Sequence, residues 1–231
     1  MDTDALKRAA ADAAVTLVQS GMAVGLGTGS TAAHAIAALI RRVREERLDI
    51  VAIATSERSA AQAREGGVQL TDFAHHPRLD LTIDGADEIT RGALHLLKGA
   101  GGALLREKIV ASASDRLAII ADESKLVDQL GLVAPLPVEV VRFGWETTAE
   151  RVSRVAEPKL RLGPDGHPYR TDGGNYILDC TCGAITDPAA LEAALARIVG
   201  VVESGLFVGM ADVAFVAGPT GVVRLERSVT A

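Results

Sequence analysis

The chain has 231 residues, of which 48% are hydrophobic, so it is long and apolar enough to form the core of a folded, soluble protein. A formal net charge of −6 and only 3% aromatic residues exclude the basic, ring-rich surface that nucleic acids require. An anionic ligand would therefore need a local pocket. No apolar run is long enough to cross a bilayer, and the opening residues MDTDALKRAA are acidic where a signal peptide is basic. We therefore expect a cytoplasmic protein with no membrane partner.

Disulfide and metal chemistry are not expected. Cys180 and Cys182 fall on one face of the strand-like run NYILDCTCG, where two small buried hydrophobic residues are a simpler interpretation than a disulfide. The chain has no second cysteine pair, and none of its five histidines has the spacing of metal ligands. The sequence predicts no metal site.

Helices and strands alternate through the first 122 residues. Apolar residues at helical spacing predict a helix from Asp4 to Ser20, and GMAVGLG follows as a short buried strand. The next elements are, in chain order, helix GSTAAHAIAALIRRVREER, strand DIVAIATS, helix ERSAAQAREGG, strand LDLTIDGADEI, helix ALLREKIVASAS and strand RLAIIAD. This alternation predicts an α/β fold with a parallel, doubly wound sheet.

The pattern changes after Leu130, where APLPVEVVRFGW introduces prolines and β-branched residues. The elements that follow are strand 138–143, helix 146–156, strand LRLG, strand 174–182, helix 188–199 and strand VVESG. This β-α-β-β-α-β order predicts a smaller ferredoxin-like α+β domain. The final DVAFVAGPTGVVRLER predicts a hairpin. We expect a larger domain of residues 1–130 plus 205–231 and a smaller one of residues 131–204.

The turn GLGTGST, from Gly25 to Thr31, lies between a predicted strand and a predicted helix, as phosphate-binding turns do. Backbone N–H groups, the hydroxyls of Thr28, Ser30 and Thr31, and the positive end of the helix dipole would converge there. A dinucleotide fingerprint needs glycine at position 30, where this chain has serine, so a small phosphorylated ligand fits better than NAD. The alternative is that Ser30 and Thr31 only cap the helix.

The motif DGADE places Asp84 and Asp87 just past the carboxyl end of an apolar strand, the edge at which open α/β sheets bind ligands. Such carboxylates would orient sugar hydroxyls, exchange protons or bind Mg²⁺. The alternative is a turn stabilised by an aspartate side chain.

The stretch LKGAGGALLREK puts glycines 99, 101 and 102 between Lys98 and a predicted helix that carries Glu107. Glycine permits close approach of backbone to a ligand, so the N–H groups of this loop would face an anion. An ordinary strand-to-helix turn is the alternative, and most surface glutamates are simply solvated.

Lys125, in ADESK, also follows a strand and would reach a phosphate. The four polar clusters come at the carboxyl ends of successive parallel strands, so we expect them to share one cleft. A carboxylate base, a lysine, two aspartates and a phosphate-binding loop together suit proton abstraction next to the carbonyl of a phosphorylated sugar.

These residues resemble the A-type ribose-5-phosphate isomerases. The motifs GLGTGSTAAH, TSERSAAQA, LDLTIDGADEI, LKGAGGALLREKI, ADESKLVDQLG, PLPVEV and TDGGNYILD occur in the order and spacing of that family and cover nearly the whole chain. The resemblance implies a Rossmann-like domain with a smaller ferredoxin-like domain, a homodimer or higher oligomer, and no metal or other cofactor. It also implies interconversion of ribose 5-phosphate and ribulose 5-phosphate through an enediolate, in the pentose phosphate pathway.

The resemblance implies roles by position. Glu107 would be the base, Lys98 and the glycine loop would surround the reacting oxygens, and Asp84 and Asp87 would bind sugar hydroxyls. The residues expected to contact substrate are Lys7, Thr28, Gly29, Ser30, Thr31, Asp84, Gly85, Ala86, Asp87, Lys98, Gly99, Ala100, Gly101 and Lys125.

Two positions depart from the family pattern. Ala100 interrupts what are usually three consecutive glycines, so we expect positive φ angles at Gly99, Gly101 or Gly102 and not at position 100. Leu105 replaces a commoner threonine and removes a hydroxyl close to the expected base.

Two other functions compete with the isomerase. The first is a nicotinamide-dependent dehydrogenase, which the glycine-rich turn suggests and the serine at position 30 opposes. The second is a non-catalytic sugar-phosphate sensor, as in transcriptional regulators with a similar domain. A sensor of that kind would carry a helix-turn-helix segment and would leave Glu107 without a purpose.

Overall fold

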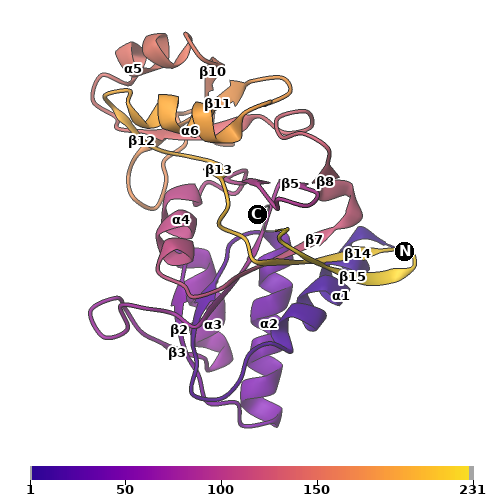
Figure 1. The fold of residues 1–231 in the computed structure, drawn as a ribbon. Coiled ribbons are helices and arrows are strands. Elements are labelled where there is room, and N and C mark those ends of the chain that lie inside the picture. The colour runs from indigo at the N-terminus through magenta and orange to yellow at the C-terminus, as the bar shows by residue number, and fades with distance from the viewer. Residues whose placement is uncertain (1, 229–231) are drawn as a thin grey trace.

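A seven-stranded sheet supports the lower part of the molecule in Figure 1, a computed structural model that describes residues 2–228. In spatial order its strands are β15 (Gly221–Glu226), β14 (Val213–Gly218), β7 (Leu117–Asp122), β4 (Leu81–Gly85), β1 (Ala23–Leu26), β2 (Val51–Ala54) and β3 (Gln69–Leu70). Neighbours are parallel, except that β14 and β15 form the predicted antiparallel hairpin. The chain order reverses at β1, which has β2 on one side and β4 on the other, so this is a doubly wound sheet.

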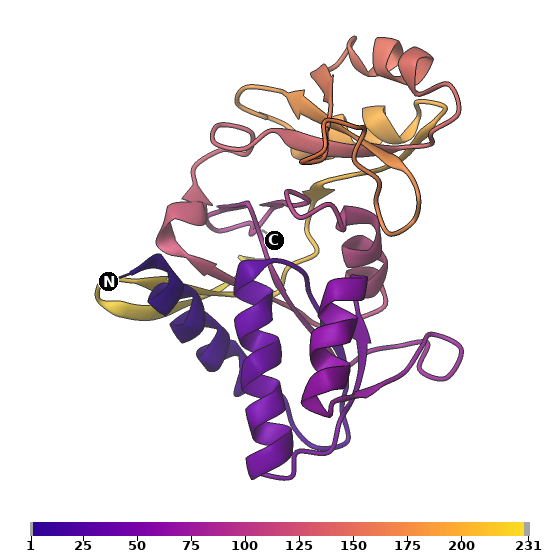
Figure 2. The ribbon, with the colours of Figure 1, turned by 180° about the vertical axis from the view of Figure 1, so that it is seen from behind.

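Helices cover both faces of this sheet (Figure 2). One face is covered by three helices, α1 (Thr3–Val15), α2 (Ser30–Glu45) and α3 (Glu57–Gly66). The other face is covered by α4 (Leu104–Ser112). Successive residues of a strand point to opposite faces. Ile120 therefore packs in the core beneath α1 and α2, whereas Ile119 packs in the core that contains Ala111 of α4.

A second, antiparallel sheet lies at the other end of the molecule (Figure 1). In spatial order it consists of β10 (Glu157–Leu160), β11 (Tyr176–Thr181), β9 (Leu136–Val140) and β12 (Val201–Ser204), and its helices are α5 (Trp145–Val152) and α6 (Pro188–Ala196). Val138, Leu178 and Leu195 are fully buried in its core. The elements follow one another as β-α-β-β-α-β, so the predicted ferredoxin-like α+β unit is confirmed.

The first helix is shorter than the apolar spacing predicted, because α1 ends at Val15 and not at Ser20. The hydroxyl of Thr16 donates to the carbonyl oxygen of Ala13, which a continuing helix would offer to the N–H of Leu17. The N–H of Leu17 bonds to Ala14 instead. A side-chain hydroxyl has displaced a helical hydrogen bond.

The predicted strand LDLTIDGADEI is divided in two. β4 ends at Gly85, and the chain then enters a separate four-stranded sheet. That sheet consists, in spatial order, of β13 (Leu206–Phe207), β6 (Leu96–Leu97), β5 (Glu88–Thr90) and β8 (Leu126–Val127), none of which the sequence predicted as separate strands. Glu88 is fully buried, and its carboxylate accepts hydrogen bonds from the backbone of Gly131, Val133 and Ala134. These bonds satisfy the buried charge and keep β5 apart from β4.

The strand predicted at LRLG lies earlier in the chain, at Glu157–Leu160, and the two ranges share only Leu160. β10 is an edge strand, where Pro158 is tolerated because one side of the strand needs no N–H donor. The connection from β10 to β11 then extends toward α4, as both ribbon views show (Figure 2).

The topology leaves a crevice where β1 and β4 end side by side, at the point where the chain order reverses. Among the helices of residues 2–228, none is both long enough and apolar enough to cross a membrane.

Candidate active site

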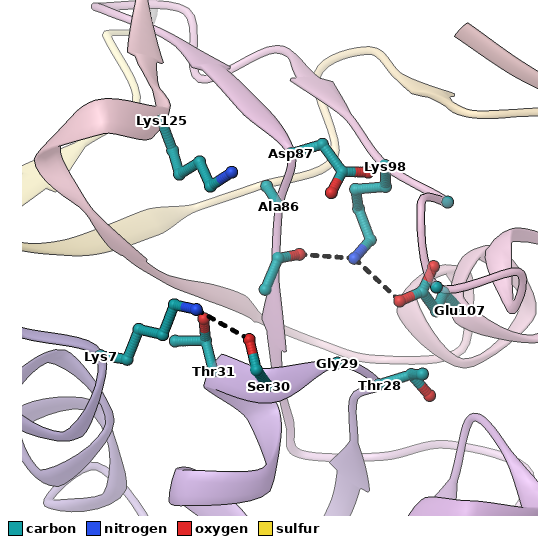
Figure 3. Close-up of a pocket in the computed structure, with 13 residues that line it drawn as sticks. Lys7, Thr28, Gly29, Ser30, Thr31, Ala86, Asp87, Lys98, Glu107 and Lys125 are labelled. Atoms are coloured by element: carbon teal, nitrogen blue, oxygen red, sulfur yellow. Dashed lines mark hydrogen bonds and ion pairs between the residues drawn. The ribbon is translucent and has the colours of Figure 1, made fainter. Parts of the chain in front are cut away.

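A cavity of about 120 Å³ opens at this crevice (Figure 3). Its size suits a small metabolite better than a dinucleotide. The residues that line it are Lys7, Thr28, Gly29, Ser30, Thr31, Gly85, Ala86, Asp87, Lys98, Gly99, Gly101, Glu107 and Lys125. All of them belong to the site expected from the sequence. The other two expected residues border the cavity, because Asp84 contacts Lys98 and Ala100 donates to Asp87.

One end of the cavity is rich in cations and hydroxyls. Lys7 of α1 donates to Oγ of Ser30 at 2.9 Å, and Thr31 lies beside them in the first turn of α2 (Figure 3). Lys125, at the end of a short 3₁₀ helix (Glu123–Lys125), extends into the cavity opposite these residues. The free backbone N–H groups at the start of α2 add positive potential. This end of the cavity is suited to a phosphate group.

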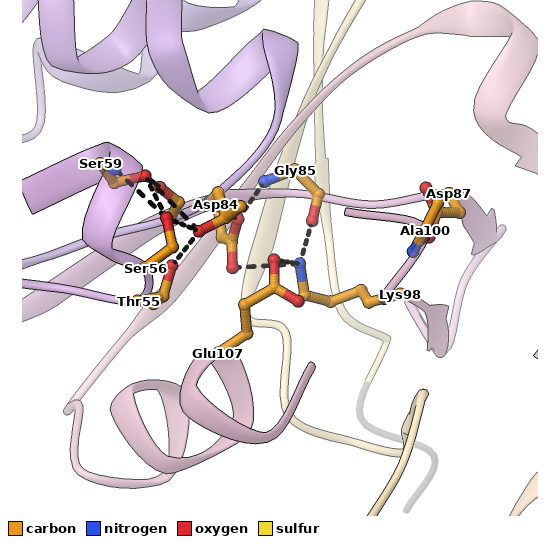
Figure 4. Close-up of polar contacts among 12 residues, drawn as sticks. Thr55, Ser56, Ser59, Asp84, Gly85, Asp87, Lys98, Ala100 and Glu107 are labelled. Atoms are coloured by element: carbon orange, nitrogen blue, oxygen red, sulfur yellow. Dashed lines mark hydrogen bonds and ion pairs between the residues drawn. The ribbon is translucent and has the colours of Figure 1, made fainter. Parts of the chain in front are cut away.

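Asp84 fastens the turn after β1 to the end of β4 (Figure 4). Its Oδ1 accepts the N–H of Thr28 at 3.0 Å and that of Gly85 at 2.7 Å. Gly27 makes the approach possible, because a Cβ at that position would lie 2.0 Å from Oδ1 of Asp84. Gly29, with a φ of 109°, then turns the chain into α2.

Thr55, Ser56 and Ser59 form a buried cluster of hydroxyl groups (Figure 4), and Thr28 bonds to this cluster. Its Oγ1 donates to Oγ of Ser56 at 2.8 Å and lies 2.7 Å from Oγ1 of Thr55, and Ser59 continues the cluster. The hydroxyl of Thr28 therefore does not point at a phosphate with the other hydroxyls of its loop, as the sequence had suggested. No sequence motif predicted a function for this Thr55 cluster (Thr55, Ser56 and Ser59). It follows β2 and lies beside the turn because β1 and β2 are neighbours.

Lys98 and Glu107 form the opposite end of the cavity, and both are almost fully buried. Nζ of Lys98 donates to the carbonyl oxygen of Gly85 at 2.5 Å and lies 3.0 Å from Oδ2 of Asp84. It also donates to Oε1 of Glu107 at 3.2 Å. These contacts account for all three N–H donors of the ammonium group. Within the described chain, Oε2 of Glu107 is buried and has no hydrogen-bond partner.

The pKa values of both groups are raised, for different reasons. Removal from water, followed by the charge of Asp84, raises the pKa of Glu107 to about 8, although Lys98 acts in the opposite direction. Burial alone would lower the pKa of Lys98, but the carboxylates of Asp84 and Glu107 outweigh it and raise that pKa. Lys98 is therefore cationic at neutral pH, whereas Glu107 is poised to exchange a proton.

The glycine loop lies between these two side chains in the sequence. Gly99 and Gly102 have φ angles of 109° and 79°, as predicted, whereas Ala100 and Gly101 are outside the positive-φ region. The alanine that interrupts the glycines therefore causes no backbone strain. The N–H of Ala100 donates to Oδ2 of Asp87 at 2.9 Å, which ties the loop to the segment after β4 (Figure 4).

The charged neighbours of Glu107 in α4 point away from the cavity. Arg106 donates to Oε1 of Glu57 at 2.8 Å, and Lys108 pairs with acidic groups of α6 and β12. Leu105 lines a separate, smaller cavity. The hydroxyl that this leucine replaces would therefore not line the cavity of Glu107.

The connection between β10 and β11 also contacts the glycine loop of the site, which no sequence motif predicted. Tyr169 lies so close to Gly102 that a Cβ on the glycine would be 2.3 Å from the phenol oxygen. Arg161 donates to the carbonyl oxygen of Gly99 at 3.0 Å, although the two residues are 62 positions apart. Arg161 and Gly99 meet only because the connection after β10 packs against the glycine loop, and no local sequence pattern predicts this contact.

No group of three or more His, Cys, Asp or Glu residues within residues 2–228 is arranged to hold a metal ion. The site offers a buried carboxylate with a raised pKa, a permanent cation, backbone donors and a phosphate-binding end. This set is suited to moving a proton next to a carbonyl group of a sugar phosphate.

Comparison with known proteins agrees with this chemistry. The sequence model of the family described as ribose 5-phosphate isomerase A (phosphoriboisomerase A) matches residues 51–221. Ribose-5-phosphate isomerase A of Gloeobacter violaceus is 59% identical over 229 residues, which is 99% of each chain. The protein of that name from a Synechococcus species is 56% identical and covers 97% of this chain and 98% of its own.

Solved structures agree over the same length. A D-ribose-5-phosphate isomerase in complex with phospho-erythronic acid is 36% identical, with a TM-score of 0.95, and covers 98% of this chain and 100% of its own. Ribose 5-phosphate isomerase from Plasmodium falciparum is 38% identical, with a TM-score of 0.94 and the same coverage. From its sequence, its fold and the residues around its cavity, this chain belongs to the ribose 5-phosphate isomerase A family.

Proposed function

We propose that this protein interconverts D-ribose 5-phosphate and D-ribulose 5-phosphate, as the names of its relatives indicate for those proteins. The observation that carries the proposal is the unpartnered, buried Oε2 of Glu107, on a carboxyl whose pKa is raised to about 8. A carboxylate oxygen without a donor is free to accept a proton, and a pKa near neutrality suits a group that must also return it. In the pentose phosphate pathway this reaction interconverts an aldose and a ketose.

The reaction is a proton transfer between neighbouring carbons. Glu107 removes the proton from the carbon next to the aldehyde, and the electrons move into the carbonyl oxygen to form an enediolate. Lys98 and the N–H groups of the glycine loop stabilise the negative charge on the oxygens. The hydroxyl proton of the second carbon moves to the oxygen of the first, and the protonated Glu107 returns its proton to the first carbon, which completes the ketose.

Lys98 changes partners in this scheme. In the free protein its three donors are occupied, one of them by Oε1 of Glu107. Once Glu107 is protonated it no longer carries the charge that attracts the ammonium group, so this donor is released for the enediolate oxygen. Asp84 holds Lys98 throughout, and Asp87 is placed to orient a sugar hydroxyl from the cavity wall.

The phosphate group occupies the cationic end of the cavity, with Lys7, Ser30, Thr31 and Lys125. This assignment places the phosphate away from Glu107, and the sugar spans the space between them (Figure 3). In this assignment the Thr55 cluster supports the turn after β1 through Thr28 and is not one of the groups that bind the phosphate.

A coupled assay tests the proposal. Purified protein should convert ribose 5-phosphate to ribulose 5-phosphate without added NAD, and unphosphorylated ribose should react far more slowly. In D₂O, solvent deuterium should appear on the carbon next to the carbonyl, because the protonated base can exchange with water before it returns the proton. Conversion with complete retention of the original hydrogen would favour a hydride shift and contradict the role of Glu107.

We also propose that the protein is a cytoplasmic homodimer. Residues 1–130 plus 205–231 form its larger domain, and residues 131–204 form its smaller one. The smaller domain provides the contact between the two subunits. Phe143 and Val199 support this contact, because they are 97% and 76% exposed and belong to segments joined by the hydrogen bond from the N–H of Val141 to Gly200. Light scattering should give twice the mass of one chain. Phe143→Ser should weaken the association, and an unchanged dimer would place the contact elsewhere.

A further inference from the structure

The connection between β10 and β11 brings a guanidinium group to the back of the glycine loop. Nη1 of Arg161 donates to the carbonyl oxygen of Gly99 at 3.0 Å and to that of Ala100 at 3.1 Å. Nε and Nη2 of the same guanidinium group donate to the carboxylate of Asp179 of β11, at 2.9 Å and 2.5 Å. The side chain is 14% exposed, and its guanidinium lies 5.8 Å from the ring centre of Tyr169. Arg161 is therefore fixed in place before it meets the loop.

The two carbonyl contacts fix two peptide planes. In a trans peptide the C=O and the following N–H point in opposite directions. The carbonyl of Gly99 points to Arg161, so the N–H of Ala100 points the other way and donates to Oδ2 of Asp87 at 2.9 Å. By the same geometry, the carbonyl of Ala100 directs the N–H of Gly101 away from Arg161. Gly101 lines the cavity, and its N–H has no protein partner within residues 2–228.

The loop needs such an external anchor because of its composition. Reversal of the peptide between Ala100 and Gly101 changes ψ of the first residue and φ of the second, and glycine tolerates nearly any φ. A reversed peptide would present a carbonyl oxygen to the cavity in place of an N–H donor. The cation on the carbonyl also polarises the peptide, which strengthens the N–H as a donor.

We infer that Arg161, held by Asp179, is a positioning residue that orients the peptide between Ala100 and Gly101 so that the N–H of Gly101 faces the enediolate oxygen. The inference rests on the proposed isomerase reaction and on the glycine loop as its oxyanion donor. This inference gives the sheet of β9, β10, β11 and β12 a part in catalysis, although Arg161 does not touch the substrate itself.

Arg161→Met tests the inference, because methionine keeps much of the length and apolar packing but cannot bind the carbonyls. Loss of one oxyanion donor lowers kcat by about 10² to 10³-fold in enzymes where it has been removed. We expect kcat to fall by at least about tenfold with KM within a few-fold, since the phosphate contacts are intact. Arg161→Lys should retain an intermediate kcat, because an ammonium group can reach a carbonyl but cannot also hold Asp179 with a fork.

Two further measurements separate positioning from folding. Guanidinium at non-denaturing concentrations should restore part of the kcat of Arg161→Ala, whereas methylammonium should not. Phospho-erythronic acid, whose carboxylate stands in for the enediolate oxygens, should bind Arg161→Met more weakly in proportion to the loss in kcat/KM. Inorganic phosphate should bind as it does to the parent.

Asp172→Asn is the matched control. Asp172 lies on the same connection, and its polar contacts are with the N–H of Glu57 at 2.9 Å and with Arg106, not with the carbonyls of the glycine loop. It should lower thermal stability without a comparable loss in kcat. An equal loss of kcat in Asp172→Asn would mean that Arg161 acts only by docking the two sheets. A folded Arg161→Met with kcat within twofold of the parent would overturn the inference, whereas an active Glu107→Gln would overturn the proposed function instead.

Discussion

Lys98 and Glu107 are joined at only one oxygen: Nζ lies 3.2 Å from Oε1, while Oε2 is buried without a partner among the described residues. Lys98 therefore orients the carboxylate and leaves its second oxygen available to the substrate. Leaving a buried polar atom unpaired costs on the order of 1–3 kcal/mol, so Oε2 needs an explanation, and a role in proton transfer provides one.

Glu107→Gln should abolish most of the turnover. Glutamine keeps the size of the side chain but cannot accept the proton, and a positioned base contributes about 10² to 10⁴-fold to a rate. We expect kcat to fall by at least that factor while phospho-erythronic acid still binds within a few-fold of the parent. Deuterium incorporation from D₂O should disappear together with conversion. A variant that exchanged deuterium without converting substrate would transfer the role of base to Asp87 or Asp84.

The pH dependence should reveal the raised pKa of Glu107. Only the ionised carboxylate can accept a proton, so kcat/KM should be constant above about pH 8 and fall by about tenfold for each pH unit below it. The substrate phosphate titrates near pH 6 and would add a second, lower inflection. A profile that stayed flat down to pH 5 would show that the carboxyl ionises near its ordinary pKa in the free protein.

Substitutions at the cationic end should act mainly on binding. Lys125→Ala and Ser30→Ala remove contacts that persist from the bound substrate to the transition state, so KM should rise more than kcat falls. Ser30→Ala also removes the acceptor that holds Lys7 at 2.9 Å. Kinetics with ribose 5-phosphate and with unphosphorylated ribose will check this. Parent-like affinity for the phosphorylated sugar in both variants would place the phosphate elsewhere.

Gly27→Ala should damage both stability and activity. Its Cβ would lie 2.0 Å from Oδ1 and 2.6 Å from the backbone of Asp84, so the turn after β1 must move away from β4. Overpacking of this kind costs roughly 1–3 kcal/mol, which thermal denaturation would detect. Ala100→Gly is the matched control, because Ala100 has an ordinary φ and the change should lower stability by at most about 1 kcal/mol. Equal stability of the two variants would contradict the close approach at Gly27.

Isomerisation should survive treatment with EDTA. Lys98 and the N–H groups of the glycine loop supply the positive charge and donors that the enediolate needs, so a divalent ion has no necessary part in the proposed reaction. The assay is turnover after chelation and desalting. Loss of activity that Mg²⁺ or Mn²⁺ restored would contradict this expectation.

The order of the elements and most residues of the cavity follow from the amino-acid sequence. Alternating strands and helices identify a doubly wound sheet, because parallel neighbours require crossover connections, and polar residues after such strands must meet at one edge. This reasoning located Ser30, Asp87 and Lys125, which follow the parallel strands β1, β4 and β7. Lys98 also lines the cavity, but it follows β6, which pairs antiparallel with β5 and β13 in the separate sheet, and not a strand of the parallel sheet as expected. The positive φ angles of Gly99 and Gly102 also followed from the residue types, since only glycine adopts them at low cost.

The contacts that each side chain of the site makes depend on tertiary packing and do not follow from local sequence. The hydroxyl of Thr28 could face a ligand or the protein, and the proximity of β1 and β2 directs it to Ser56. The raised pKa of Glu107 depends on burial and on Asp84, neither of which local sequence specifies. Arg161 and Gly99 are 62 residues apart in the chain, and they meet because the connection after β10 packs against the glycine loop. Periodicity encodes contacts within an element or between adjacent strands, whereas contacts between separate sheets depend on the packing of whole surfaces.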